Sequence, residues 1–112
     1  MAATTNLGEL EQLILLAVLR LDDDAYGVTI RAELSKRAGR AVAPGALYTA
    51  LERLETKGLV ASRMGDPTPQ RGGRAKRYVK VTSAGLESLK RAHRAYERLA
   101  DGLDLRRGKY AH

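Results

Sequence analysis

Residues 71–80 form a run rich in cations and free of carboxylates, with basic side chains at Arg71, Arg74, Lys76, Arg77 and Lys80. Ammonium and guanidinium groups neutralise phosphates and donate hydrogen bonds to their oxygens. The chain carries 20 Lys and Arg against 13 Asp and Glu, a formal charge of +7. Residues 63–112 hold 13 basic and 5 acidic side chains, against 7 and 8 in residues 1–62. The run predicts a polyanion-binding surface, although a solvated basic loop would have the same composition.

Residues that could support catalysis or metal binding are few. The absence of Cys excludes a disulfide framework, a thiolate zinc site and thiol catalysis. His93 and His112 have no nucleophile or carboxylate at a useful spacing. The acidic residues 22–24 have no second ligand cluster, and the glycine pair at 72–73 has no phosphate-loop pattern around it. We therefore expect neither an enzyme nor a metal or cofactor site.

The overall composition fits one small domain. The chain has 112 residues and is 44% hydrophobic, which argues against wholesale disorder. No apolar run approaches the roughly 18 residues that span a bilayer, and the N-terminus has no signal-peptide pattern. We expect a soluble, cytoplasmic protein with no membrane partner.

Apolar spacing and turn residues predict helices and a hairpin around the cationic run. The helices are expected over residues 8–21, 25–38, 44–58 and 83–103, and the strands over residues 59–63 and 77–82. Pro44 is expected to start the third helix, Gly39 and Gly58 to end the second and third, and Thr82 or Ser83 to cap the last. The acidic residues 22–24 are expected to cap the second helix, which should bury Val28, Ile30 and Leu34. This order predicts an α+β, mostly α fold, a winged helix-turn-helix. Its expected parts are a DNA-binding domain over residues 1–82, a dimerisation helix over 83–104 and a basic flexible tail over 105–112.

The third helix has the pattern of a recognition helix. Leu47, Ala50, Leu51 and Leu54 form its inward stripe, which leaves small residues outward near its N-terminal end. The predicted DNA-binding residues are Gly45, Tyr48, Thr49 and Arg53 on this helix and Arg71, Arg74, Lys76 and Arg77 in the hairpin. Thr49 and Arg53 could read base edges, whereas Tyr48 is equally consistent with a partly buried core residue.

The last helix has a heptad-like seam. Its members are Leu86, Leu89, His93, Tyr96, Ala100 and Leu103. The first helix is apolar nearly all round, so one of its sides is expected to be covered by another subunit, with Leu13 and Leu16 as the predicted contacts. These patterns predict a homodimer; the alternative is that the seam packs on its own domain.

Basic residues opposite the seam also fit a membrane-surface helix, but His93 and Ala100 make the seam a poor lipid anchor.

Several short motifs, taken together, resemble the PadR family of transcriptional regulators over about residues 7–103. They are Leu7-Gly8-Glu9-Leu10-Glu11, Ala25-Tyr26-Gly27, Pro44-Gly45-Ala46-Leu47-Tyr48-x-x-Leu51-x-Arg53-Leu54-Glu55-x-x-Gly58-Leu59-Val60, Gly73-Arg74 and Tyr78-x-x-Val81-Thr82-x-x-Gly85. The resemblance implies a dimeric repressor of the short, single-C-terminal-helix subfamily, often released by a small-molecule effector. It places Tyr48 and Arg53 on the DNA side and Arg74 in the wing.

The chain departs from that family pattern at three points. Ala43 stands where a capping Ser is common, Val79 stands where a second aromatic is common, and the chain has no Trp for a drug-binding platform. The sequence therefore predicts a homodimeric, sequence-specific repressor on a pseudo-palindromic operator in double-stranded DNA. The alternative is an architectural or RNA-binding protein that uses only its charge and binds any duplex equally.

Overall fold

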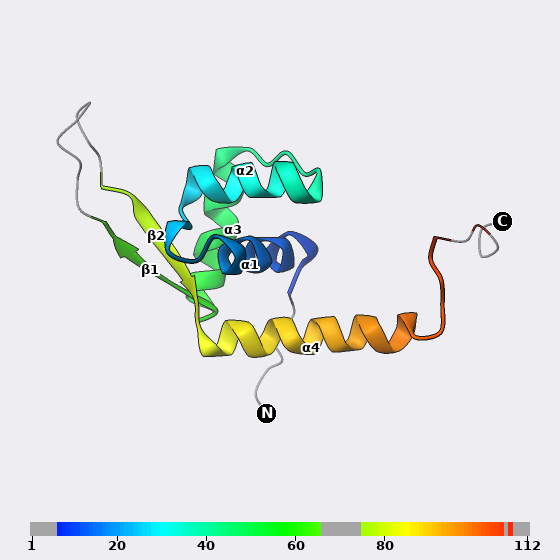
Figure 1. The fold of residues 1–112 in the computed structure, drawn as a ribbon. Helices are drawn as coiled ribbons and strands as arrows, with labels where there is room; N and C mark the ends of the chain where they lie inside the picture. The colour runs from blue at the N-terminus through cyan, green and yellow to red at the C-terminus, as the bar shows by residue number, and fades with distance from the viewer. Residues whose placement is uncertain (1–6, 66–74, 107, 109–112) are drawn as a thin grey trace.

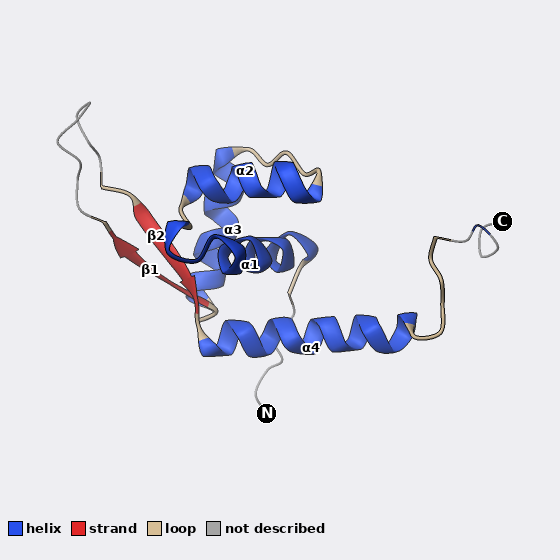
Figure 2. Cartoon of the chain, viewed as in Figure 1, coloured by secondary structure: helices blue, strands red, loops and turns tan. Residues whose placement is uncertain are grey.

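The computed structural model describes residues 7–65, 75–106 and 108, which form a helical body with a two-stranded hairpin and a long last helix (Figure 1). The elements are α1 (Glu9–Leu21), a short 3-10 turn η1 (Asp22–Asp24), α2 (Gly27–Ala38), α3 (Pro44–Thr56), β1 (Val60–Met64), β2 (Arg77–Val81) and α4 (Ser83–Ala100). The first three helices make the body, and α4 lies below α1 and extends past it (Figure 2). The predicted mostly helical α+β fold is confirmed.

The core is built from aliphatic side chains of all four α-helices and both strands. Its largest fully buried members are Ile14, Leu15, Ile30, Leu34, Leu47, Leu54 and Leu59. On α3 the predicted inward stripe is buried throughout, which confirms the helical spacing from which it was predicted. Burying one such aliphatic side chain contributes roughly 1.5–3 kcal/mol, so these leucines and isoleucines dominate the cohesion of the body.

Helix α3 has well-defined ends. Pro44 is its first residue, where a missing N–H costs nothing, and the N-cap Ala43 offers no side-chain hydrogen bond, as the departure from the family pattern predicted. At its other end Gly58 adopts φ 77°, and the Leu59 amide donates to the Leu54 carbonyl at 2.9 Å. This left-handed turn satisfies the last carbonyls and directs the chain into β1.

The start of α2 differs from the sequence prediction. Residues 22–24 form η1, and none of their carboxylates caps α2. Instead, the Tyr26 amide donates to the Thr29 hydroxyl at 3.0 Å, and that hydroxyl donates to the Asp24 carbonyl at 2.6 Å. The prediction that Val28 is buried is also wrong, because it is 65% exposed. Val28 lies two residues from Ile30, about 200° around the helix, and so faces away from the core.

The turn between α2 and α3 is held by charged side chains. Gly39 ends α2 in the left-handed conformation, φ 62°, as predicted. Arg31 of α2 donates to the Val42 carbonyl at 2.7 Å, and Arg40 pairs with Glu9 of α1 at 2.9 Å. These bonds tie the turn to α2 and to α1.

The hairpin is tied to the body through a backbone bond. In the antiparallel register Ser62 pairs with Val79 and Arg63 with Tyr78. The Val79 amide points away from β1 and donates to the Ala25 carbonyl at 2.9 Å. Strand β2 is therefore hydrogen-bonded along both edges, to β1 on one side and to the chain ahead of α2 on the other.

Helix α4 begins at a tight contact with the residue just ahead of β1. Thr82 is the N-cap, as predicted, and its hydroxyl accepts from the Gly85 amide at 3.1 Å. A Cβ on Gly85 would lie 2.1 Å from the Leu59 carbonyl oxygen, so only glycine fits there. The helix ends at Ala100, earlier than predicted, because Gly102 with φ 80° turns the chain and leaves Leu103 beyond it.

Among the described residues, no helix is both long enough and apolar enough to cross a membrane.

A partly buried ion pair joins the start of α1 to Lys57, the residue that follows α3. The Glu11 carboxylate accepts from the Gly8 amide at 2.9 Å and from Lys57 Nζ at 3.0 and 2.9 Å through its two oxygens. Burial alone would raise the pKa of Glu11, but the Gly8 amide and the Lys57 ammonium outweigh it and bring the pKa below its ordinary value of 4.5. Ionised Glu11 therefore stabilises the folded state above the pKa it has in the unfolded chain.

We expect Glu11→Gln to lower the free energy of unfolding at pH 7 by about 1.5–3 kcal/mol, the range for hydrogen bonds to a charged group. Because the folded-state pKa is depressed, this difference should shrink as the pH falls below about 4.5 and through that lowered value, where the wild-type carboxylate becomes protonated. Urea unfolding between pH 3 and pH 7 measures it. The control is Glu87→Gln, which removes an exposed pair on α4 and should change stability by less than about 0.5 kcal/mol. Equal losses in the two variants, or a difference independent of pH, would contradict the prediction.

Candidate nucleic-acid interface

The outward face of α3 is open near its N-terminal end. Gly45 and Thr49 are exposed, and a Cβ added to Gly45 would meet no atom within 4 Å. Arg53 lies exposed one turn after Thr49. A face of small residues lets the helix backbone approach a groove closely, and a guanidinium one turn further on can reach a base edge or a phosphate.

Tyr48 is half exposed, at 49%, and reaches from α3 to the start of α2. Its hydroxyl lies 2.7 Å from the position that a Cβ on Gly27 would occupy, so the close approach requires glycine at that position or a shift of the ring. The side chain therefore covers the edge of the core and still presents one side to solvent. Both roles considered from the sequence, core tyrosine and surface hydroxyl, are compatible with this placement.

The hairpin has two distinct faces, because side chains alternate along paired strands. The inner face carries the buried Val60 and Val79 together with Ser62 and Arg77. Arg77 forms an ion pair with Glu55 of α3, and the Ser62 hydroxyl donates to the other oxygen of that carboxylate at 3.0 Å. Arg77, predicted to contact DNA, thus has its charge engaged against α3.

The outer face carries a cation–aromatic cluster made of Arg63, Lys76, Tyr78 and Tyr26. The Arg63 guanidinium carbon lies 4.7 Å from the centre of the Tyr78 ring, and Lys76 Nζ lies 4.6 Å from the centre of the Tyr26 ring. The two rings pack edge to face with their centres 5.5 Å apart. Stacking of this kind holds the cations without consuming their charge.

Two further details define the charge on this outer face. Lys80 lies in the same alternation and pairs with Asp23 of η1 at 3.4 Å. Hydrogen bonding to the Tyr26 side chain, with smaller contributions from the charges of Tyr26, Tyr78 and Asp24, raises the pKa of Lys76. Lys76 is therefore fully protonated at neutral pH.

The predicted DNA-binding residues fall into three groups. Gly45, Tyr48, Thr49 and Arg53 share the exposed side of α3, and Lys76 and Arg77 lie on opposite faces of the hairpin. Arg71 and Arg74 lie outside the described residues. Sequence reasoning missed Arg63 as a candidate; its place directly opposite Tyr78 in the strand register is the signal that identifies it.

The predicted dimerisation residues on α4 fall into a buried and an exposed group. Leu89 is only 7% exposed and packs in the core of its own chain, which matches the alternative that the seam packs on its own domain. It follows Gly85 and Ser88 on the part of α4 that lies against the body. Further along, Tyr96 is 71% exposed and Leu99, absent from the predicted seam, is 83% exposed. Exposed seam members also include Leu86, His93 and Leu103, while Ala100 is partly covered.

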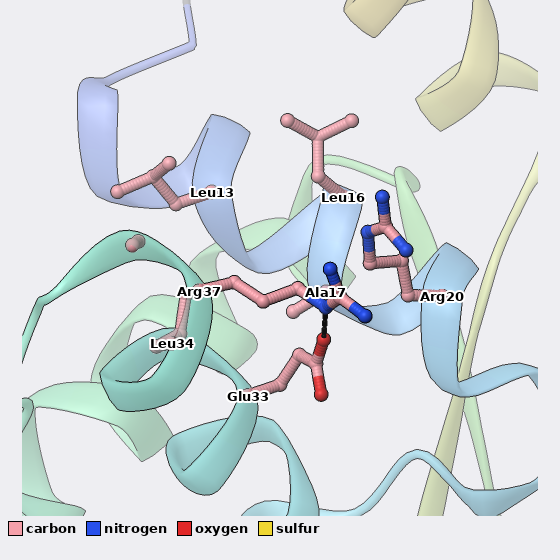
Figure 3. Close-up of a pocket in the computed structure, with 8 residues that line it drawn as sticks. Leu13, Leu16, Ala17, Arg20, Glu33, Leu34 and Arg37 are labelled. Carbon is pink, nitrogen blue, oxygen red and sulfur yellow. Dashed lines mark hydrogen bonds and ion pairs between the residues drawn. The ribbon is translucent and has the colours of Figure 1, made fainter.

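A shallow hollow of about 170 Å³ lies between α1 and α2 (Figure 3). Its lining residues are Leu13, Leu16, Ala17, Arg20, Glu33, Leu34, Arg37 and Ala38. Glu33 and Arg37 are paired across one turn of α2, as the dashed line in Figure 3 shows. The predicted interface residues Leu13 and Leu16 therefore border an open apolar depression rather than a filled surface.

Comparisons with known proteins agree with this architecture. The model of the "Transcriptional regulator PadR-like family" matches residues 15–91. Transcriptional regulator Rv3488 of Mycobacterium tuberculosis is 42% identical over 81 residues, which cover 70% of this chain and 69% of that protein. A PadR-like transcription factor from Bacteroides fragilis is 29% identical with a TM-score of 0.68, over 82% of this chain and 84% of that one. A PadR family transcription regulator from Clostridium difficile R20291 is 26% identical with a TM-score of 0.67, over 84% and 96% of the two chains. The fold is thus a DNA-binding winged helix-turn-helix, and this chain belongs to the PadR-like family of transcriptional regulators.

Proposed function

We propose that this protein is a homodimeric repressor that binds a pseudo-palindromic operator with α3 and the hairpin of each copy. The observation that carries the proposal is the exposed small-residue face of α3 beside the outer face of the hairpin. The α3 face supplies contacts to base edges, and the hairpin supplies contacts to phosphates. Two copies related by a two-fold axis would read half-sites about 34–36 Å apart.

Within this proposal the residues have separate roles. Thr49 lies outward in the N-terminal half of α3, where its hydroxyl or methyl group can contact a base. Arg53 reads guanine or neutralises a phosphate, and Tyr48 donates its hydroxyl to a phosphate. Arg77 contributes to DNA binding indirectly, because its ion pair with Glu55 holds the hairpin against α3. The roles of Arg71 and Arg74 as wing phosphate contacts rest on the sequence alone.

We expect Thr49→Ala to weaken binding to the operator about tenfold, or about 1.4 kcal/mol, and to leave binding to a scrambled duplex unchanged. The reason is that a base contact carries sequence information, whereas phosphate contacts do not. Fluorescence anisotropy titration against the DNA upstream of the protein's own gene, and against a scrambled duplex of equal length, measures both affinities. Thr56→Ala is the matched control, because Thr56 is exposed at the far end of the same helix.

Two outcomes of that titration would count against the proposal. If the wild-type protein binds both duplexes equally at every salt concentration, the protein is an architectural nucleic-acid binder rather than an operator-specific regulator. If Thr49→Ala and Thr56→Ala behave alike, α3 does not read bases through its N-terminal half.

The dimer is proposed from the exposed apolar side of α4. Helix α4 continues past the body (Figure 1), and its later residues Tyr96 and Leu99 are largely exposed within the described part of the chain. Leu16 and Leu19 of α1 are also about half exposed. A second copy that covered both surfaces would remove these side chains from water and would also fill the hollow beside Leu13 and Leu16.

We expect Leu99→Glu to weaken self-association at least 100-fold, because it places a carboxylate in the proposed interface. The monomer fold should survive, since the side chain makes no core contact in the single chain. Sedimentation equilibrium measures the dimer constant, and circular dichroism monitors the fold. Arg94→Gln changes the net charge by the same single unit on the opposite side of α4 and should leave the dimer intact. An unchanged dimer constant in Leu99→Glu would remove this side of α4 from the interface.

Release by a small-molecule effector remains a prediction from the family resemblance. The hollow between α1 and α2 is smaller than the roughly 300–1,000 Å³ of sites for drug-sized ligands. For that reason we assign it to side chains of the second copy.

A further inference from the structure

The cation–aromatic cluster at the root of the hairpin has a geometry that the family assignment leaves without a role. Arg63, Lys76 and Tyr78 lie on the outer face of the hairpin, on the opposite side from the buried Val60 and Val79. Tyr26 reaches this face from the residue just ahead of α2. The cluster thus joins the hairpin to the helix-turn-helix body through side chains as well as through the backbone.

Two of the three outer-face cations keep their charge available. Lys80 is paired with Asp23, but within the described residues neither Arg63 nor Lys76 forms an ion pair. Both are exposed, and each is held over a tyrosine ring. A guanidinium stacked by its face keeps its N–H edge free for a bidentate bond, and a stacked ammonium keeps outward donors.

The cluster also has a fixed position relative to α3. The Tyr26 ring packs on Tyr78, and the Tyr48 hydroxyl of α3 lies so near the adjacent Gly27 that a Cβ there would be 2.7 Å from it. Gly65 permits the close approach of the Tyr78 ring, because a Cβ there would lie 2.6 Å from its edge. A continuous strip of contacts therefore leads from the exposed side of α3 to the two cations.

We propose that Arg63 and Lys76 each bind a DNA phosphate, and that Tyr78 and Tyr26 are positioning residues that hold these cations at a set place beside α3. This rests on the proposed function, since it assumes that the α3 side of the molecule meets a duplex. Preorganised cations lose less side-chain entropy on binding than free ones, so each should contribute its full share of phosphate neutralisation. The contact is independent of base sequence, so it should be visible with any duplex.

The test is the slope of the logarithm of the binding constant against the logarithm of salt concentration, measured with a scrambled duplex. Each phosphate contact contributes about 0.9 to that slope. We expect Arg63→Gln and Lys76→Gln each to reduce the slope by about one and the affinity several-fold. The matched control is Arg94→Gln on α4, which removes one exposed positive charge elsewhere and should leave the slope at the wild-type value.

The positioning role has its own readout. Tyr78→Leu should lower the affinity about as much as Arg63→Gln, and combining the two changes should add little, because both remove the same contact. Tyr78→Phe keeps the ring and should bind as the wild type does, which separates positioning from general loss of fold. A slope for Arg63→Gln and Lys76→Gln equal to that of Arg94→Gln would overturn the proposal. A wild-type protein that bound no duplex in a salt-dependent way would instead overturn the proposed function.

Discussion

One backbone hydrogen bond, from the Val79 amide to the Ala25 carbonyl, decides where the hairpin lies relative to the recognition helix. A two-stranded hairpin is at best marginally stable alone in water. Nothing within the hairpin sets its orientation relative to the rest of the protein. Here β2 is bonded on both edges, and the buried Val79 side chain anchors it in the core. The segment that supplies the second edge, residues 25–26, also starts α2. The hairpin and the helix-turn-helix unit are therefore joined through one shared segment.

The distribution of ion pairs follows from that arrangement. Carboxylates of the body engage the cations that face inward or lie at the joints, namely Glu11 with Lys57, Glu55 with Arg77 and Asp23 with Lys80. Arg63 and Lys76 are instead held by aromatic rings. An aromatic ring positions a cation and leaves its charge uncancelled. A carboxylate positions the cation and also cancels its charge. The net positive charge is thereby concentrated where a polyanion would meet the hairpin.

Much of this fold could be predicted from local signals. The spacing of the α3 leucines, Pro44 at its start, the glycines at 39 and 58 and the Thr82 cap each act within one turn of chain, and each is found as predicted. Two errors are local, the burial of Val28 and the cap of α2, and the others concern long-range placement. Whether Arg77 or Arg63 faces outward depends on strand register, since a shift of one residue exchanges the faces. The heptad spacing predicts Leu89 as a seam residue. It is buried instead, because the body lies against that half of α4.

The most direct test of this arrangement is native-state hydrogen exchange of the Val79 amide. If β2 is fixed to the body, this amide should be protected as strongly as the Ile30 amide, which donates to Tyr26 inside α2 at 2.8 Å. Both should then exchange only when the whole domain unfolds. Fast exchange at Val79 with Ile30 still protected would show that the hairpin opens independently. The recognition helix and the hairpin would then not form a single preset surface.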